Sequence, residues 1–214
     1  MKTLCTLFFL ALLPLTVSAK GGSAYCLSYA DYRQNAWQPI EQLDMHYRSG
    51  MTSLWWGGAS FMPKTNNSKT AKILEKKARF IVHHDSLYIN CRHLSYERIR
   101  LGNWYAPAFV FDRHYFVLIA LNYEALRHSS QTAYMFGIIG AAIAAASSKD
   151  DYICYFYNPL SETIEPIDQL FMEKLFIDAP ELEAEYNAIP LESTNKPETI
   201  IPLLQRLGLI ERGE

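Results

Sequence analysis

The chain has 214 residues, of which half are hydrophobic and a fifth are charged, and this composition excludes a disordered polymer. Its 20 Lys and Arg against 22 Asp and Glu give a formal charge of -2 without any long basic run, which argues against nucleic acid as a partner. The length suits one domain, or a domain with an appendage.

Residues 1–19 have the pattern of a secretory signal peptide. Lys2 precedes an uncharged run from Leu4 to Leu15, and compact residues up to Ala19 suit signal peptidase. As a helix this run reaches about 18 Å, which is short of the roughly 30 Å hydrocarbon core and disfavours a retained membrane anchor. We therefore expect cleavage after Ala19, export to the periplasm or cell envelope, and a single α+β domain over residues 20–214.

Three cysteines remain after the leader, namely Cys26, Cys91 and Cys154. An oxidising compartment favours pairs, so an odd number leaves one thiol free unless it pairs between chains. Cys91 and Cys154 fall at strand-like positions and could meet if those strands are neighbours. The alternative is three buried thiols that pack as small hydrophobic residues.

Local patterns in the first two thirds of the chain predict a short helix followed by hairpins. Ser28 is typical of an N-cap for a helix over residues 28–32. The polar stretch 64–72 is expected to be an exposed loop. Runs rich in β-branched and aromatic residues predict strands over 78–82, 86–90, 104–111, 115–121 and 152–157, with a short partner over 161–165. Hairpin connections favour an antiparallel sheet, with a strongly curved or barrel-like form as alternatives.

The C-terminal part, about residues 166–209, changes to a helical period. Pro197 suits a first helical turn, Gly208 a C-terminal stop, and Asp168 and Glu181 place negative charge at helix starts. These helices are short and apolar on one face, so we expect them to pack on the sheet. The apolar positions are Ile167, Leu170, Phe171 and Leu175, then Leu182, Tyr186 and Ile189, then Ile200, Leu203, Leu204 and Leu207.

A run without charge, residues 133–146, predicts a central helix rich in Gly and Ala. Gly137, Gly140, Ala141 and Ala144 fall on one helical stripe, and small residues at this spacing let two helices approach closely. Membrane association through residues 133–148, or self-association, is one interpretation. A helix buried against the sheet is the other, because the run is too short to cross a bilayer unaided.

Two groups of side chains are candidates for a site. His83, His84 and His93 are weak candidate metal ligands in a metal-dependent hydrolase, although adjacent strand residues face opposite ways and turn histidines are commonly solvated. The four tryptophans could form an aromatic platform for a sugar or an apolar ligand, and core packing is the alternative. They are Trp37, Trp55, Trp56 and Trp104.

Several short motifs recur in a recognisable order: Ser28-Tyr29-x-Asp31-Tyr32, Leu87-Tyr88-Ile89-Asn90, Gly102-x-x-Tyr105, the Gly/Ala-rich run, residues 152–158, and Phe176-Ile177-Asp178-Ala179-Pro180-Glu181-Leu182. Over residues 25–207 the chain resembles an uncharacterised family, a domain of unknown function, of exported proteins from Gram-negative gut and oral bacteria. The resemblance implies export and envelope residence, and it implies no reaction.

We expect a non-enzymatic binding or interaction module of the cell envelope, without a cofactor, whose partner is an unknown protein or envelope component. The weak candidate interaction residues are Trp55 and Trp56 with the small residues of the central run. A metal-dependent hydrolase and a periplasmic binder of an apolar small molecule are the alternatives.

Overall fold

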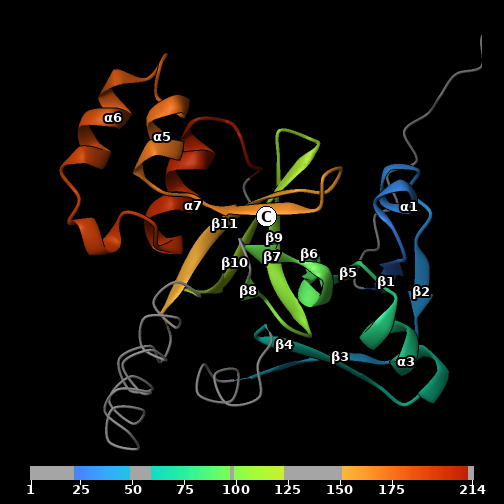
Figure 1. Ribbon diagram of the computed structural model, residues 1–214. Helices are drawn as coiled ribbons and strands as arrows, with labels where there is room; N and C mark the ends of the chain where they lie inside the picture. Colours follow the sequence, from blue (N-terminus) through green and yellow to red (C-terminus); the bar gives the residue numbers. More distant parts are fainter. Residues whose placement is uncertain (1–21, 49–58, 97–98, 123–150, 212–214) are drawn as a thin grey trace, which may run out of the picture.

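The computed structural model describes residues 22–48, 59–96, 99–122 and 151–211. Within these ranges the chain forms a ten-stranded antiparallel sheet, a separate two-stranded hairpin and five α-helices, three of them C-terminal (Figure 1). This is the predicted α+β class. The strands are β1 (Ser23–Cys26), β2 (Gln38–Ile40), β3 (Leu43–Tyr47), β4 (Phe61–Thr65), β5 (Phe80–His83), β6 (Ser86–Asn90), β7 (Ser95–Tyr96), β8 (Ile99–Arg100), β9 (Tyr105–Phe111), β10 (Tyr115–Leu121), β11 (Tyr152–Asn158) and β12 (Thr163–Pro166). The helices are α1 (Tyr29–Arg33), α3 (Ser68–Lys76), α5 (Gln169–Leu175), α6 (Pro180–Asn187) and α7 (Pro197–Arg206), with 3-10 turns η1 (Cys91–His93) and η2 (Leu191–Ser193).

The sheet curls strongly. Its strand order is β12-β11-β10-β9-β6-β5-β1-β2, with β4 joined to β9 and β3 joined to β4. In a flat sheet β5 and β10 would lie about 14 Å apart. The ring centroids of Phe80 on β5 and Phe116 on β10 are nevertheless 5.4 Å apart, so the two halves of the sheet face each other. The outer strands β12 and β2 do not pair in the described part of the chain, so the sheet is not closed, which corrects the barrel-like alternative.

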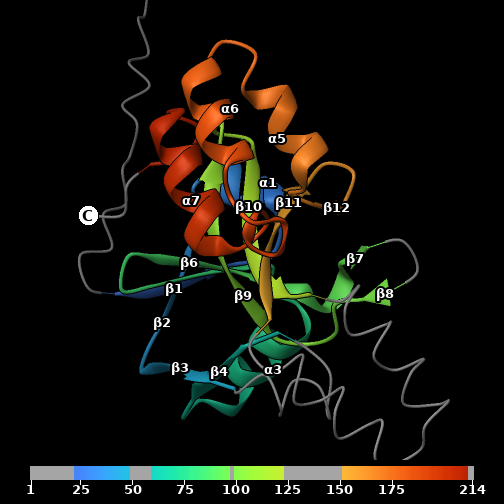
Figure 2. The ribbon, with the colours of Figure 1, turned by 90° about the vertical axis from the view of Figure 1, so that its left-hand side faces the viewer.

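Alternation along β10 and β11 divides the core into two layers. Phe116 and Leu118 point into the curl, where they meet buried side chains of β1, β5 and β6. Val117 and Cys154 point outward into a second cluster with α5, α6 and α7. Because both faces are covered, these strands are continuously apolar instead of alternating with polar residues. Figures 1 and 2 show the C-terminal helices together beside β10 and β11, which confirms that they pack on the sheet.

Helix α3 covers the other end of the sheet (Figure 2). Leu74 is fully buried there with Ile81 and Tyr105. The Tyr105 hydroxyl donates to the carbonyl of Leu74 at 2.7 Å and lies 3.1 Å from that of Ala78. The side-chain amide of Asn90 donates to the Ala78 carbonyl at 2.9 Å. These bonds satisfy carbonyls that the end of the helix leaves without intrahelical partners.

Most predicted elements are present, but the loop over 64–72 and the burial of Leu170 were predicted wrongly. The Ser28 hydroxyl accepts the Asp31 amide at 3.0 Å and caps α1, and the predicted hairpins, β11, β12 and C-terminal helices all form. The expected loop over 64–72 is instead the end of β4 followed by α3, whose N-cap is Asn67. Leu170 was placed on an apolar helix face, but its side chain is 67% exposed.

The three cysteines of the described chain are free and buried. Cys91 faces the inside of the curl and Cys154 faces the C-terminal helices, so the sheet separates them and the suggested pair does not form. The alternative, three buried thiols that pack as small hydrophobic residues, is confirmed. Of the helices described, none combines the length and apolar character that crossing a bilayer requires. The leader and the central run lie outside the described residues.

Candidate functional site

A pocket of about 400 Å³ opens beside α1, where β1, β5, β6 and β9 meet. Aliphatic walls come from four strands, and the helix and the segment after it contribute two aromatic rings, an amide and a guanidinium. The lining residues are Ala24, Tyr32, Arg33, Asn35, Trp37, Val82, Leu87 and Val110. Small-molecule sites commonly have this size and this ratio of apolar walls to polar groups.

The capped helix α1 fixes one wall of the pocket. Tyr32 stacks on Phe80 at 5.0 Å between centroids and meets Phe116 edge-on at 5.3 Å. Trp37 then packs edge-on against Tyr32 at 5.8 Å. Asn35 has a left-handed backbone (φ 56°), a conformation that asparagine tolerates and that reverses the chain between α1 and Trp37. Both rings are therefore anchored in the core while one side of each lines the pocket.

Contacts from the β9–β10 turn hold α1 over this end of the sheet. The Tyr29 hydroxyl donates to the His114 carbonyl at 3.0 Å. The Arg33 guanidinium donates to Nδ1 of His114. A guanidinium can only donate, so this nitrogen of His114 is the acceptor.

A second hollow adjoins the pocket and shares Leu87 and Val110 with it. It has a volume of about 310 Å³, and Glu211 contributes a carboxylate to its lining. Burial raises the pKa of the Tyr32 phenol, nearby Tyr29 and Cys26 add to the rise, Arg33 opposes it, and Glu211 adds the smallest increase. Glu211 in the second hollow therefore acts on Tyr32 in the first, across the wall that the two hollows share.

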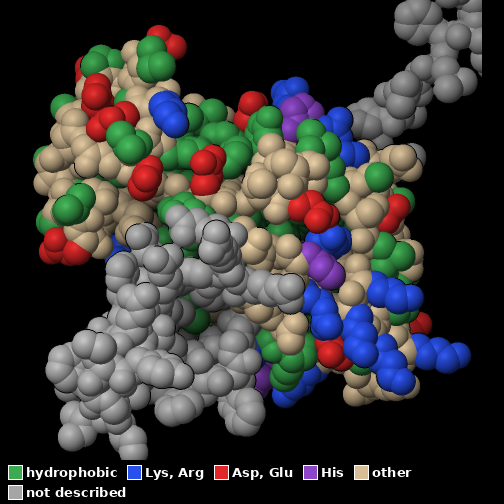
Figure 3. Space-filling view, viewed as in Figure 1, with side chains coloured by type: hydrophobic (Ala, Val, Ile, Leu, Met, Phe, Trp, Pro, Cys, Tyr) green, Lys and Arg blue, Asp and Glu red, His purple; other side chains and the backbone are tan. Residues whose placement is uncertain are grey.

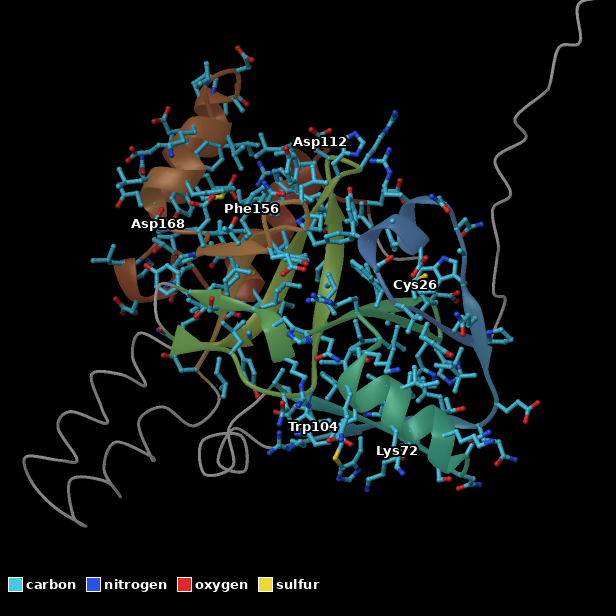
Figure 4. All side chains as sticks on the ribbon, turned by 45° about the vertical axis from the view of Figure 1, so that its right-hand side comes forward. Cys26, Lys72, Trp104, Asp112, Phe156 and Asp168 are labelled. Carbon is cyan, nitrogen blue, oxygen red and sulfur yellow. The ribbon has the colours of Figure 1, made fainter. Side chains whose placement is uncertain are left out.

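The structure separates the two tryptophans of the predicted platform that it describes. Trp37 lines the pocket, whereas Trp104 lies at the α3 end of the molecule, well away from Cys26 and α1 (Figure 4). The Arg48 guanidinium lies 5.9 Å from the Trp104 ring centroid, a cation–π distance. Trp55, Trp56, Gly137, Gly140, Ala141 and Ala144 lie outside the described residues, so those interaction residues stay predictions.

The candidate metal ligands are only partly brought together. The rings of His83 and His84 are 4.0 Å apart at the β5–β6 turn, where His84 has a left-handed backbone (φ 46°). His93 belongs to η1, at the opposite end of β6. In the ranges that the structure describes, no three His, Cys, Asp or Glu side chains are grouped as a metal site would require.

His83 also takes part in a serine–histidine contact. Its Nδ1 lies 2.7 Å from Oγ of Ser23 on the neighbouring strand. Burial lowers the pKa of His83, His84 lowers it further, and Asp44 opposes them. Because side chains alternate along a strand, this pair faces away from Ala24 and Val82, and hence away from the pocket.

Sequence reasoning selected Trp37 but missed the other pocket residues. Tyr32 and Arg33 belong to a helix that was predicted correctly, yet only strand order shows that Val82, Leu87 and Val110 face them. An uninterrupted apolar run on β9 and β10 is the one signal that both faces of these strands are covered.

Comparison with known proteins identifies a family whose function is unknown. No curated protein and no solved structure matches the chain. One family model matches residues 24–211 and is described as a family of unknown function, DUF6563. That match begins within β1 and ends just after α7, so it includes every element of the sheet and the pocket. The chain therefore belongs to the DUF6563 family of unknown function.

Proposed function

We propose that this protein is an exported binding module of the cell envelope, and that the pocket beside α1 holds a small, largely apolar molecule. The observation that carries the proposal is a hollow of about 400 Å³ whose walls are aliphatic and aromatic. Ligands in such sites gain most of their affinity from apolar contact, and a few polar groups set their orientation. The export part of the proposal depends on the signal-peptide pattern of residues 1–19.

The ionisation of the thiols favours binding over covalent catalysis. Burial raises the pKa of both Cys26 and Cys91 to about 12, and it also raises the pKa of Cys154. A nucleophilic cysteine needs the opposite shift, because the thiolate is the reactive form.

Filling the pocket provides the test. Leu87 is half-buried on the pocket wall, so Leu87→Phe places a larger side chain in the space that a ligand would take. The full chain is produced with its leader, and its intact mass shows whether the recovered protein begins at Lys20. We expect Nile red, a neutral apolar dye, to fluoresce on binding, and Leu87→Phe to weaken that binding at least tenfold.

Leu182→Phe is the matched control. Leu182 is also half-buried, but it packs among the C-terminal helices. It should leave dye binding unchanged. Equal dye affinity in the wild type and Leu87→Phe, with both folded by circular dichroism, would contradict the proposed site.

A further inference from the structure

Arg33 is an exposed cation on the lining of the pocket. Arg79, Lys196 and Arg206 each form an ion pair with a carboxylate. No carboxylate of the described ranges forms an ion pair with Arg33, whose one hydrogen-bond partner there is His114. A guanidinium has five N–H groups in a planar fork, so donors remain after the bond to His114.

The charges around the pocket are unbalanced in favour of an anion. Its lining contains one cation and no carboxylate. Asp31 is on the same helix, but it does not line the pocket. Glu211 lines the adjoining hollow on the other side of Leu87 and Val110. A charged group at the pocket therefore meets Arg33 before it meets an acid.

We propose that the ligand is an amphipathic monoanion, with a hydrocarbon body against the aliphatic and aromatic walls and a carboxylate on Arg33. This inference rests on the proposed function, whose pocket it uses. The fork of an Arg side chain matches the two oxygens of a carboxylate, and such charge-assisted bonds are stronger than neutral ones. The walls formed by Val82, Leu87 and Val110 offer no hydrogen-bonding side chains for a polyol, which favours a hydrocarbon body over a neutral sugar.

Two probes of equal chain length separate the charge from the apolar contact. Octanoate and 1-octanol compete with Nile red for the recovered protein, and the concentration that displaces half of the dye is measured for each. We expect octanoate to act at about one-tenth of the octanol concentration in the wild type. Arg33→Gln should remove this preference by weakening octanoate alone, and Arg33→Lys should restore part of it.

Lysines on and around α3 provide the matched control, because a carboxylate could also bind there. Lys64, Lys69, Lys72, Lys76 and Lys77 are exposed, and Lys and Arg side chains gather at the α3 end of the surface in Figure 3. Lys72→Gln removes one such charge away from the pocket and should leave the octanoate preference intact (Figure 4).

The outcomes distinguish this inference from the proposed function. Equal potency of the two probes in the wild type, or a preference that survives Arg33→Gln or disappears in Lys72→Gln, overturns the anion assignment while dye binding still supports the pocket. Dye binding that is insensitive to Leu87→Phe overturns both.

Discussion

At the scale of single residues, a hydrogen bond from the Tyr105 hydroxyl connects the sheet to α3. This hydroxyl is fully buried and donates to the carbonyl of Leu74 in the last turn of that helix, and it also lies close to the carbonyl of Ala78 just after the helix. In Tyr105→Phe the ring still fills its place, but the Leu74 carbonyl loses this buried donor. We expect the free energy of unfolding to fall by about 1–3 kcal/mol, measured by urea denaturation.

Tyr88→Phe is the control for this change. Tyr88 packs against the same cluster from β6, and its hydroxyl has no hydrogen-bond partner among the described residues. Its removal should change the free energy of unfolding by less than about 0.5 kcal/mol. Equal losses in the two variants would show that the Tyr105 bonds add little.

Sequence could identify single pocket residues but not their grouping. Trp37 is a large aromatic residue and was selected for that reason, but so was Trp104, which lies at the other end of the molecule. Arg33 and Val110 are 77 positions apart, and no local period connects them. Their shared pocket follows from strand order, which a single chain does not encode in local spacing.

At the scale of elements, α3 depends on its N-cap Asn67, which lies in a polar stretch that is typical of a loop. Asn67 Oδ1 accepts the amides of Lys69 and Thr70 at 3.0 and 3.2 Å. Asn67→Ala leaves both amides to solvent and should lower the free energy of unfolding by about 1 kcal/mol, measured by thermal denaturation.

Asn66→Ala provides the comparison for the cap. Asn66 is the preceding residue, and its amide donates to Gln42 at an exposed position, where the bond competes with water. We expect a smaller loss than for Asn67→Ala. The reverse order would show that the cap is not what fixes the start of α3.

The predictions of helices and strands were correct where the apolar pattern was long and wrong where it was short. The β9–β10 hairpin and α7 have long apolar patterns, and both form. The loop expected over 64–72 failed because α3 presents lysines outward and buries only Leu74 completely. Proline is rare inside a sheet, but β4 pairs with β9 only at Phe61, so Pro63 occupies an edge position where proline is tolerated.

At the scale of the whole molecule, the sequence predicted strong curvature of the sheet only as one alternative. Hairpins set which strands are antiparallel, but the approach of Phe80 to Phe116 depends on how far twist accumulates across four strands. That approach creates the inner core layer and the pocket at its edge. Hence the class was predictable from the chain, and the site was not.

Burying neutral thiols in both core layers should make the stability of the entire fold sensitive to alkaline pH. The pKa of the Cys91 thiol rises from 9.0 to about 12 on folding, because burial disfavours the thiolate. Between these values the unfolded chain has lost the proton and the folded chain retains it, so stability is complete below about pH 9 and falls as pH rises toward 12. Urea denaturation under reducing conditions at about pH 7 and about pH 10 should show a lower free energy of unfolding at the higher pH, with about 1 kcal/mol of the difference from each such thiol.

Cys91→Ala should therefore lose less stability between the two pH values than the wild type, although it starts from a lower value. Val117→Ala removes buried atoms without a titratable group and should keep the wild-type difference, and a Cys91→Ala chain with that same difference would exclude this thiol as a source of the pH dependence.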